Sequence, residues 1–284
     1  MRDGTAMRDA VADALRPLPT GYADLFARVL HAAEPDDRVR TVWLSGSVGR
    51  RVADAGSDLD VVLAIAPSAF DDFAATWEHW LSRVTPVVLA RELPRLPGSF
   101  YSVTPECLRL DVVAERAGTA RAADLARRVL ALSKDELTEA ESSVSSEQAG
   151  PDPTRLGELV QEFLRQMTIF PAAVVARQDW LLGVVGVQNV HLMLYQLFVE
   201  ANQPLPPMGI KQWSAKLSPR QRQVCAGLPA PTANRAGVLE GMRAAAAAFR
   251  RESAAVLAAC DAPWPADFDA AVRRYWQHQL GWPE

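Results

Sequence analysis

Cysteine is scarce in this sequence, and the few cysteines present follow no recognised pattern. The 284 residues include three, Cys107, Cys225 and Cys260, which lie far apart in the chain. An odd number at such distances fits neither a disulfide framework nor the spacing of metal ligands, and it suits a reducing compartment.

Long apolar runs are missing as well. Residues 1–5 include the charged Arg2 and Asp3 and lead into an alternating polar and apolar pattern, without the apolar stretch that a secretory signal requires. No later stretch reaches the roughly 18 uninterrupted apolar residues expected of a membrane span. We therefore expect a cytoplasmic protein with no membrane partner.

The chain has no large excess of either charge. It carries 30 Lys and Arg against 34 Asp and Glu, a formal net charge of -4, and no extended basic stretch. A long polyanion such as nucleic acid is therefore a poor partner. Hydrophobic residues make up 49% of the chain, close to the average for folded proteins, so we expect a folded chain long enough for two modest domains.

Residues 1–134 show the pattern of an α/β domain. Apolar residues at three- and four-residue spacing predict a helix that contains Phe70 and Trp77, and Ser68 is the expected N-cap. The strand candidates in this part of the chain are residues 42–44, 59–65, 87–90 and 108–113.

Composition changes sharply after this first domain. Residues 135–152 contain a run of serines and then Gly and Pro, with few large apolar side chains to bury, and we interpret them as a linker. Residues 153–284 predict an all-helical domain with a Pro-rich loop at 202–209. The helices expected there cover residues 156–167, 181–198, 236–259 and 267–280.

The clearest chemical signal is a pair of carboxylates at the start of a strand, in the run Ser57-Asp58-Leu59-Asp60. Side chains two residues apart on a strand leave the same face, so Asp58 and Asp60 lie a few ångströms apart. Like charges held so closely repel unless a cation lies between them, and carboxylate oxygens suit Mg²⁺. The pair therefore predicts a divalent metal site.

A small-residue turn precedes this pair. Gly46 allows the backbone to approach a ligand closely, and Ser47 adds a hydroxyl donor. Arg50 adds positive charge close by, although either it or its neighbour Arg51 can equally be a solvated side chain. A phosphate-binding turn beside metal-binding carboxylates is the arrangement that phosphoryl transfer requires.

Gly46-Ser47 followed by Ser57-Asp58-Leu59-Asp60 resembles the signature of the polymerase-β-like nucleotidyltransferase superfamily. The resemblance implies a domain with a small mixed sheet, a nucleoside triphosphate such as ATP as co-substrate, and Mg²⁺, taken as two ions. It also implies a third carboxylate on a later strand, for which Asp111 fits as a metal ligand, as the general base, or as both. Glu115 is the reserve candidate.

An α/β domain followed by a helical domain looks like the antibiotic nucleotidyltransferases, which modify aminoglycosides and lincosamides. In such enzymes the helical domain lines the nucleotide and acceptor sites. The resemblance implies that Lys211 or Lys216 neutralises triphosphate charge, and that Asp179 and Trp180 contact the acceptor.

Simpler roles remain open for these residues of the second half. The two lysines can be surface residues, and Asp179 can be a helix cap next to a core Trp180. His191 lies among apolar neighbours and is expected to be a hydrogen-bonded core histidine. The apolar helical half also leaves room for a homodimer contact.

The predicted function is transfer of a nucleoside monophosphate from a nucleoside triphosphate to a hydroxyl of a small acceptor, with release of pyrophosphate. Three alternatives stay open. The acceptor can be a tRNA or a protein, it can be a biosynthetic metabolite, or the chain can be a nucleotide-binding module without turnover.

Overall fold

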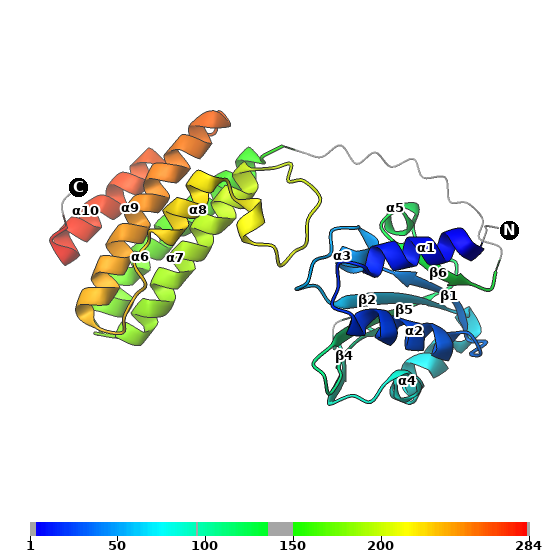
Figure 1. Cartoon of the computed structure of the whole chain (residues 1–284). Coiled ribbons are helices and arrows are strands. Elements are labelled where there is room, and N and C mark those ends of the chain that lie inside the picture. The colour runs from blue at the N-terminus through cyan, green and yellow to red at the C-terminus, as the bar shows by residue number, and fades with distance from the viewer. Residues whose placement is uncertain (1–3, 95, 136–149, 283–284) are drawn as a thin grey trace. The chain divides into compact units, whose positions relative to one another are not determined.

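The computed structural model describes residues 4–94, 96–135 and 150–282, which form two compact units. The first unit holds the described residues up to 135 together with the segment Pro207–Lys211, and the second holds the rest. In Figure 1 the colours run from blue in the unit that contains the sheet to red in the unit that is made of helices. The predicted linker at 135–152 falls mainly outside the described residues, so the domain boundaries stay a prediction.

The first unit is built around a mixed sheet of six strands in the order β3-β4-β5-β2-β1-β6. Strands β2 and β5 pair in parallel, whereas the other neighbouring strands pair antiparallel. The expected small mixed sheet is thus confirmed. Its strands are β1 (Val39–Leu44), β2 (Leu59–Ile65), β3 (Leu89–Glu92), β4 (Ser99–Val103), β5 (Arg109–Arg116) and β6 (Val129–Ser133).

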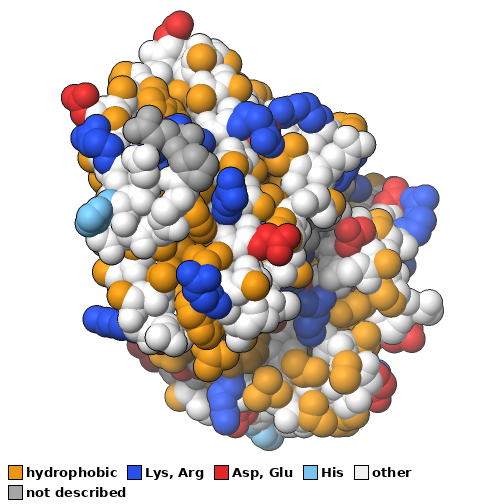
Figure 2. Space-filling view, turned by 90° about the vertical axis from the view of Figure 1, so that its left-hand side faces the viewer, with side chains coloured by type: hydrophobic (Ala, Val, Ile, Leu, Met, Phe, Trp, Pro, Cys, Tyr) orange, Lys and Arg blue, Asp and Glu red, His pale blue; other side chains and the backbone are white. Residues whose placement is uncertain are grey.

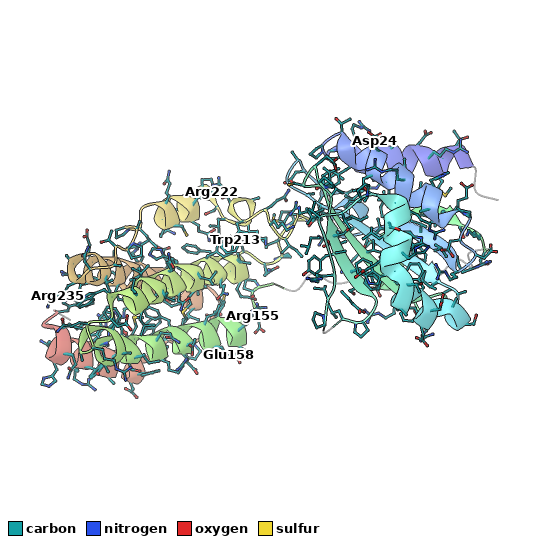
Figure 3. All side chains as sticks on the ribbon, turned by 90° about the horizontal axis from the view of Figure 1, so that it is seen from below. Asp24, Arg155, Glu158, Trp213, Arg222 and Arg235 are labelled. Atoms are coloured by element: carbon teal, nitrogen blue, oxygen red, sulfur yellow. The ribbon has the colours of Figure 1, made fainter. Side chains whose placement is uncertain are left out.

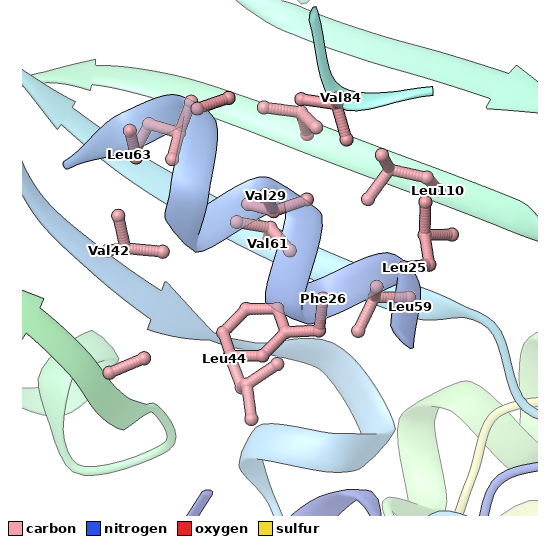
Figure 4. Packing of buried hydrophobic residues seen from close by; sticks show 14 of the residues in the cluster. Leu25, Phe26, Val29, Val42, Leu44, Leu59, Val61, Leu63, Val84 and Leu110 are labelled. Carbon is pink, nitrogen blue, oxygen red and sulfur yellow. The ribbon is translucent and has the colours of Figure 1, made fainter. Parts of the chain in front are cut away.

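Helices cover one face of this sheet. Leu25, Phe26 and Val29 of α2 lie over β1, β2 and β5 in a fully buried cluster (Figure 4). On the same face, Trp77 of α4 stacks on Phe100 with ring centroids 4.3 Å apart. The helices of this unit are α1 (Gly4–Leu15), α2 (Gly21–Ala33), the short α3 (Gly46–Gly49), α4 (Phe70–Val84) and the short α5 (Ala122–Leu125).

The strands alternate between this apolar face and a more polar one. Leu59, Val61 and Leu63 of β2 belong to the buried cluster beneath the helices. Each large aliphatic side chain buried in this way contributes about 1.5–3 kcal/mol relative to an exposed one. Because successive side chains point to opposite faces, the residues between them are directed to the other side of the sheet.

Some local expectations were wrong. Ser68 does not cap α4, because residues Pro67–Ala69 form a 3₁₀ turn and the helix begins at Phe70 with no side-chain cap. Strand β3 is displaced toward Glu92, and β5 continues to Arg116. Strands β4 and β6 were not expected as strands.

The described part of the second unit contains helices and no strand, as expected. Phe163 of α6 stacks on Phe249 of α9 with centroids 4.1 Å apart, at the centre of a second buried cluster. The helices are α6 (Pro153–Phe170), which continues into a π turn (Pro171–Val175), α7 (Trp180–Ala201), α8 (Pro219–Ala226), α9 (Arg235–Ala259) and α10 (Ala266–Leu280).

Helix α7 is unusually apolar. Among the described residues it is the one helix long and apolar enough to cross a membrane, a test that core helices of soluble proteins also pass. Val187, Leu194 and Leu197 of α7 are completely buried in the helical core, whereas Leu181 and Val185 near its start are exposed. On the face of the molecule in Figure 2, Lys and Arg side chains occur as separate patches among hydrophobic and uncharged ones.

Gly183 and Gly186 of α7 provide a matched test of helix packing. A Cβ atom at Gly183 would lie 2.5 Å from Val238 Cγ1 of α9 and 2.9 Å from Val174 Cγ1, whereas at Gly186 the nearest atom is Met242 Cε at 3.7 Å. We expect Gly183→Ala to lower the free energy of unfolding by about 1–3 kcal/mol, because the helices must move apart. Gly186→Ala should raise it by up to about 1 kcal/mol through helix propensity. Urea denaturation measures both, and equal effects would contradict the close approach of α7 and α9.

Asp36 is a buried ion-pair centre just before β1. Its carboxylate accepts hydrogen bonds from Arg38 Nε at 3.0 Å and from Arg83 Nη2 of α4 at 2.8 Å. Burial alone would raise the pKa of Asp36, but these arginines outweigh that effect and hold the pKa below its ordinary value. Through Arg83, the ionised carboxylate therefore links α4 to the start of the sheet.

Asp36→Asn should lower the free energy of unfolding by about 1–3 kcal/mol at pH 7. A depressed native pKa stabilises the protein above the ordinary pKa of Asp, so the difference from wild type should shrink as the pH falls below about 4. Urea denaturation at pH 7 and pH 3 checks the direction. The control is Asp71→Asn, since Asp71 pairs with Arg116 while 87% exposed and should change stability by less than about 1 kcal/mol. A constant difference across pH would contradict the assignment.

Candidate active site

The parallel pairing of β2 and β5 brings Asp60 and Asp111 together. The two residues are register partners, so they lie on adjacent strands about 4.8 Å apart and on the same face of the sheet. That face is opposite the one covered by α2 and α4. Asp58 lies just before β2 and two residues before Asp60, which directs it to the same side.

Burial and neighbouring charges shift the pKa values of the three carboxylates. Burial, followed by the charges of Asp58 and Asp111, raises the pKa of Asp60 to about 6. Burial and the charge of Asp58 likewise raise the pKa of Asp111. Burial would also raise the pKa of Asp58, but its hydrogen bond with Lys211 holds that pKa below the ordinary value. A bound cation would offset the repulsion within this cluster, so the cluster is expected to attract cations.

The predicted glycine turn lies directly against Asp60. Strand β1 ends at Leu44, and the Ser45 N–H donates to the carbonyl of Asp60 at 2.9 Å. Gly46 follows with φ +57°, and a Cβ atom there would lie 1.7 Å from Asp60 Oδ2. Only glycine fits a position with both this backbone conformation and this neighbour.

Ser47 presents a buried hydroxyl next to this turn. Within the described part of the chain, its Oγ has no hydrogen-bond partner. A buried polar atom without a partner is uncommon and costs free energy, whereas an anionic ligand oxygen would satisfy it. Arg50 lies beside the same turn, because its Nε donates to the Gly46 carbonyl at 2.9 Å. The turn thus combines features suited to binding a phosphate.

Two cations approach Asp58. Lys211, in the segment grouped with the first unit, places Nζ 2.6 Å from Asp58 Oδ2. Arg109 Nη1 lies 3.7 Å from the same oxygen, while its Nη2 donates to the Gly56 carbonyl at 2.9 Å. Arg109 was not among the sequence-predicted site residues. The available signal was its position two residues before Asp111, which directs both side chains to one face of β5.

The reserve carboxylate, Glu115, is engaged elsewhere on the same strand. It pairs with both terminal nitrogens of Arg128, at 2.6 and 3.0 Å, and Arg128 in turn lies over the ring of Trp43. Strand geometry separates Glu115 from Asp111 by about 13 Å along β5. The ion pair with Arg128 therefore gives Glu115 a structural role on this strand.

In the second unit, Asp179 caps α7 and accepts a hydrogen bond from the Leu182 N–H at 3.0 Å. Trp180 packs partly buried against the helical core. The Lys216 carbonyl accepts from Asn202 Nδ2 at 2.8 Å. These positions leave the predicted ligand roles of Asp179, Trp180 and Lys216 as proposals.

Trp213 and Tyr195 of the second unit form an aromatic pair for which no role was predicted. Trp213, marked in Figure 3, is 52% exposed and stacks on Tyr195 of α7 with centroids 4.3 Å apart. His191 differs from its expectation as a hydrogen-bonded core residue. Its Nε2 is buried with no partner among the described residues, and burial lowers its pKa.

Comparison with known proteins gives limited information. No family model and no curated protein match the chain. Among solved structures, the chain is similar to an aminoglycoside 6-adenyltransferase from Bacillus subtilis, with 15% identity and a TM-score of 0.41 over 90% of this chain and 96% of that one. Similarity at this level does not by itself identify a reaction or a substrate.

The carboxylates suit a cation that is shared with a ligand. In the described residues, no three His, Cys, Asp or Glu side chains form a ready-made metal cage. Mg²⁺, however, is usually held by one or two carboxylates together with substrate phosphates rather than by the protein alone. The oxygen donors of Asp58 and Asp60, next to the unpartnered Ser47 hydroxyl, fit that mode of binding.

Gly46→Ala tests whether the turn is part of a binding site. The added methyl must displace the Asp60 carboxylate, so we expect affinity for Mg²⁺ and a nucleoside triphosphate to fall at least about tenfold, since hydrogen bonds to charged groups contribute about 1.5–3 kcal/mol. Isothermal titration calorimetry measures the change. Gly56→Ala is the control, because a Cβ atom there would lie no closer than 3.4 Å to Asp54 Oδ1. Unchanged binding by a folded Gly46→Ala protein would remove the turn from the site.

Proposed function

We propose that this chain is a divalent-metal-dependent nucleotidyltransferase that moves a nucleoside monophosphate from a nucleoside triphosphate to a hydroxyl of a small acceptor. The observation that supports this most directly is the in-register pair of Asp60 and Asp111 with the Gly46 turn pressed against Asp60. In this proposal, the arrangement supplies groups that would hold a metal, hold a phosphate and accept a proton.

In this proposal Asp58 and Asp60 hold Mg²⁺, taken as two ions with Asp111 as a further ligand. When bound, the metal neutralises charge on the phosphates as the leaving group develops. The buried Ser47 hydroxyl and the backbone N–H groups of the turn hold the terminal phosphates, with Arg50 adding positive charge. These groups position the α-phosphate for attack.

Asp111 is the proposed general base. Its register with Asp60 directs its carboxylate to the face where the phosphates are proposed to bind, so that it can take the proton of an acceptor hydroxyl there. The acceptor oxygen bonds to the α-phosphorus as its proton passes to Asp111. The bond from the α-phosphorus to the bridging oxygen then breaks, and pyrophosphate leaves with that electron pair.

The proposed acceptor class is a small hydroxylated molecule such as an aminoglycoside or a lincosamide, which follows from the sequence resemblance. The same resemblance supports Lys211 and Lys216 as nucleotide ligands, and Asp179 and Trp180 as acceptor ligands. We place the reaction in the cytoplasm, where nucleoside triphosphates are available.

The deciding experiment is pyrophosphate release with each of the four common triphosphates and Mg²⁺, against a panel of aminoglycosides and lincosamides. We expect release that requires one acceptor and disappears on removal of Mg²⁺ with EDTA. Asp58→Ala should abolish release, whereas Asp111→Asn should lower kcat at least about 100-fold while nucleotide binding persists, since a positioned base contributes about 10²–10⁴-fold. Asp71→Asn is the surface control.

The remaining outcomes separate the alternatives. Loss of transfer in Glu115→Gln but not in Asp111→Asn would reverse the assignment of the base. Labelling of tRNA or protein by radioactive triphosphate, with no small acceptor active, would favour a macromolecular acceptor. Nucleotide binding without any transfer would support a non-catalytic module. A folded wild-type protein that binds neither nucleotide nor metal would overturn the proposed function.

A further inference from the structure

Asp58, a proposed metal ligand, already has a cation of the protein beside it. Lys211 Nζ lies 2.6 Å from Asp58 Oδ2, closer than the 3.7 Å of Arg109 Nη1 to the same oxygen. The lysine comes from a segment far from the strands in sequence, yet that segment is grouped with the first unit. The contact therefore needs an explanation beyond local chain geometry.

We infer that Lys211 is a resident counter-ion that competes with the divalent cation for Asp58 while no nucleotide is bound, and that it passes to the nucleotide phosphates when these arrive. This inference rests on the proposed function, because it concerns the same metal and the same phosphates. It adds cooperativity between the two ligands, since the metal should bind far more tightly in the presence of the nucleotide than alone.

Coordination geometry explains the competition. Mg²⁺ binds oxygen at about 2.0–2.1 Å, so an ion bound to Asp58 Oδ2 would compete with the ammonium group of Lys211, which now donates a hydrogen bond to that oxygen. Two cations at one carboxylate also repel each other. Metal alone must therefore displace Lys211 without offering it another partner, whereas triphosphate oxygens provide one. Each ligand then raises the affinity for the other.

Lys211 is better suited to leave than Arg109. The Arg109 side chain projects from β5 and is anchored to the Gly56 carbonyl at 2.9 Å. Lys211 has a flexible stem, is 62% exposed and lies outside the sheet, so its ammonium can move without disturbing a strand. Arg109 would thus stay beside Asp58 while Lys211 exchanges partners.

A titration of the full-length protein with Mn²⁺ tests the inference with no acceptor present. Electron paramagnetic resonance measures the concentration of the free ion at each point. Without nucleotide, Lys211→Ala should bind Mn²⁺ about three- to fivefold more tightly than wild type, the range expected for a partly exposed ion pair. With a non-hydrolysable ATP analogue, the same variant should bind the Mn²⁺–nucleotide complex about tenfold more weakly, because a charged phosphate contact is lost. The inference thus predicts that the substitution changes the two affinities in opposite directions.

Two variants sharpen the test. Arg121→Ala removes one exposed positive charge that pairs with Asp124 instead of the carboxylate cluster, and it should behave as wild type in both titrations. Lys211→Arg keeps a cation at the position and should bind Mn²⁺ alone as weakly as wild type.

Weaker or unchanged Mn²⁺ binding by Lys211→Ala in the absence of nucleotide would overturn the inference while leaving the proposed function standing, provided that wild type binds the Mn²⁺–nucleotide complex. Failure of wild type to bind either Mn²⁺ or the complex would instead overturn the proposed function itself.

Discussion

The placement of three carboxylates on one face of the sheet is the constraint that the first unit must accommodate. Asp58, Asp60 and Asp111 lie on one face of the sheet, and burial makes their mutual charge more costly than it would be in water. The β2–β5 pairing holds Asp60 and Asp111 together, since a register fixed by buried residues on the opposite face cannot slip to separate them. Burial of the apolar face thus stabilises the sheet against the repulsion among carboxylates on the polar face.

Positive groups around the cluster offset this repulsion from several directions. Lys211 and Arg109 approach Asp58, while Arg50 is held beside the Gly46 turn. None of them encloses the carboxylates, and the described residues form no complete metal cage. A centre that is only partly neutralised by its own protein is well suited to a ligand that brings both a metal and phosphates.

Local patterns in the sequence were enough to predict the Gly46 turn, the Asp58–Asp60 pair and the strands β1 and β2 beside them, because each depends on neighbouring residues. Asp111 required a family resemblance, since strand pairing across the sheet cannot be derived from periodicity alone. The contact of Lys211 with Asp58 joins residues 153 positions apart and leaves no local trace. Ser68 has the chemistry of a cap, but Pro67 begins a 3₁₀ turn that carries the chain past it before α4 starts.

The shared register of β2 and β5 also affects how this protein can change during evolution. Inserting or deleting one residue within β5 would turn Asp111 toward Phe100 and Trp77, and would move Val112 out to the polar face. Such a change would destroy the hydrophobic core and the carboxylate cluster in a single step. Point substitutions can therefore tune this face, but length variation is confined to the loops, where it leaves the pairing of the two strands intact.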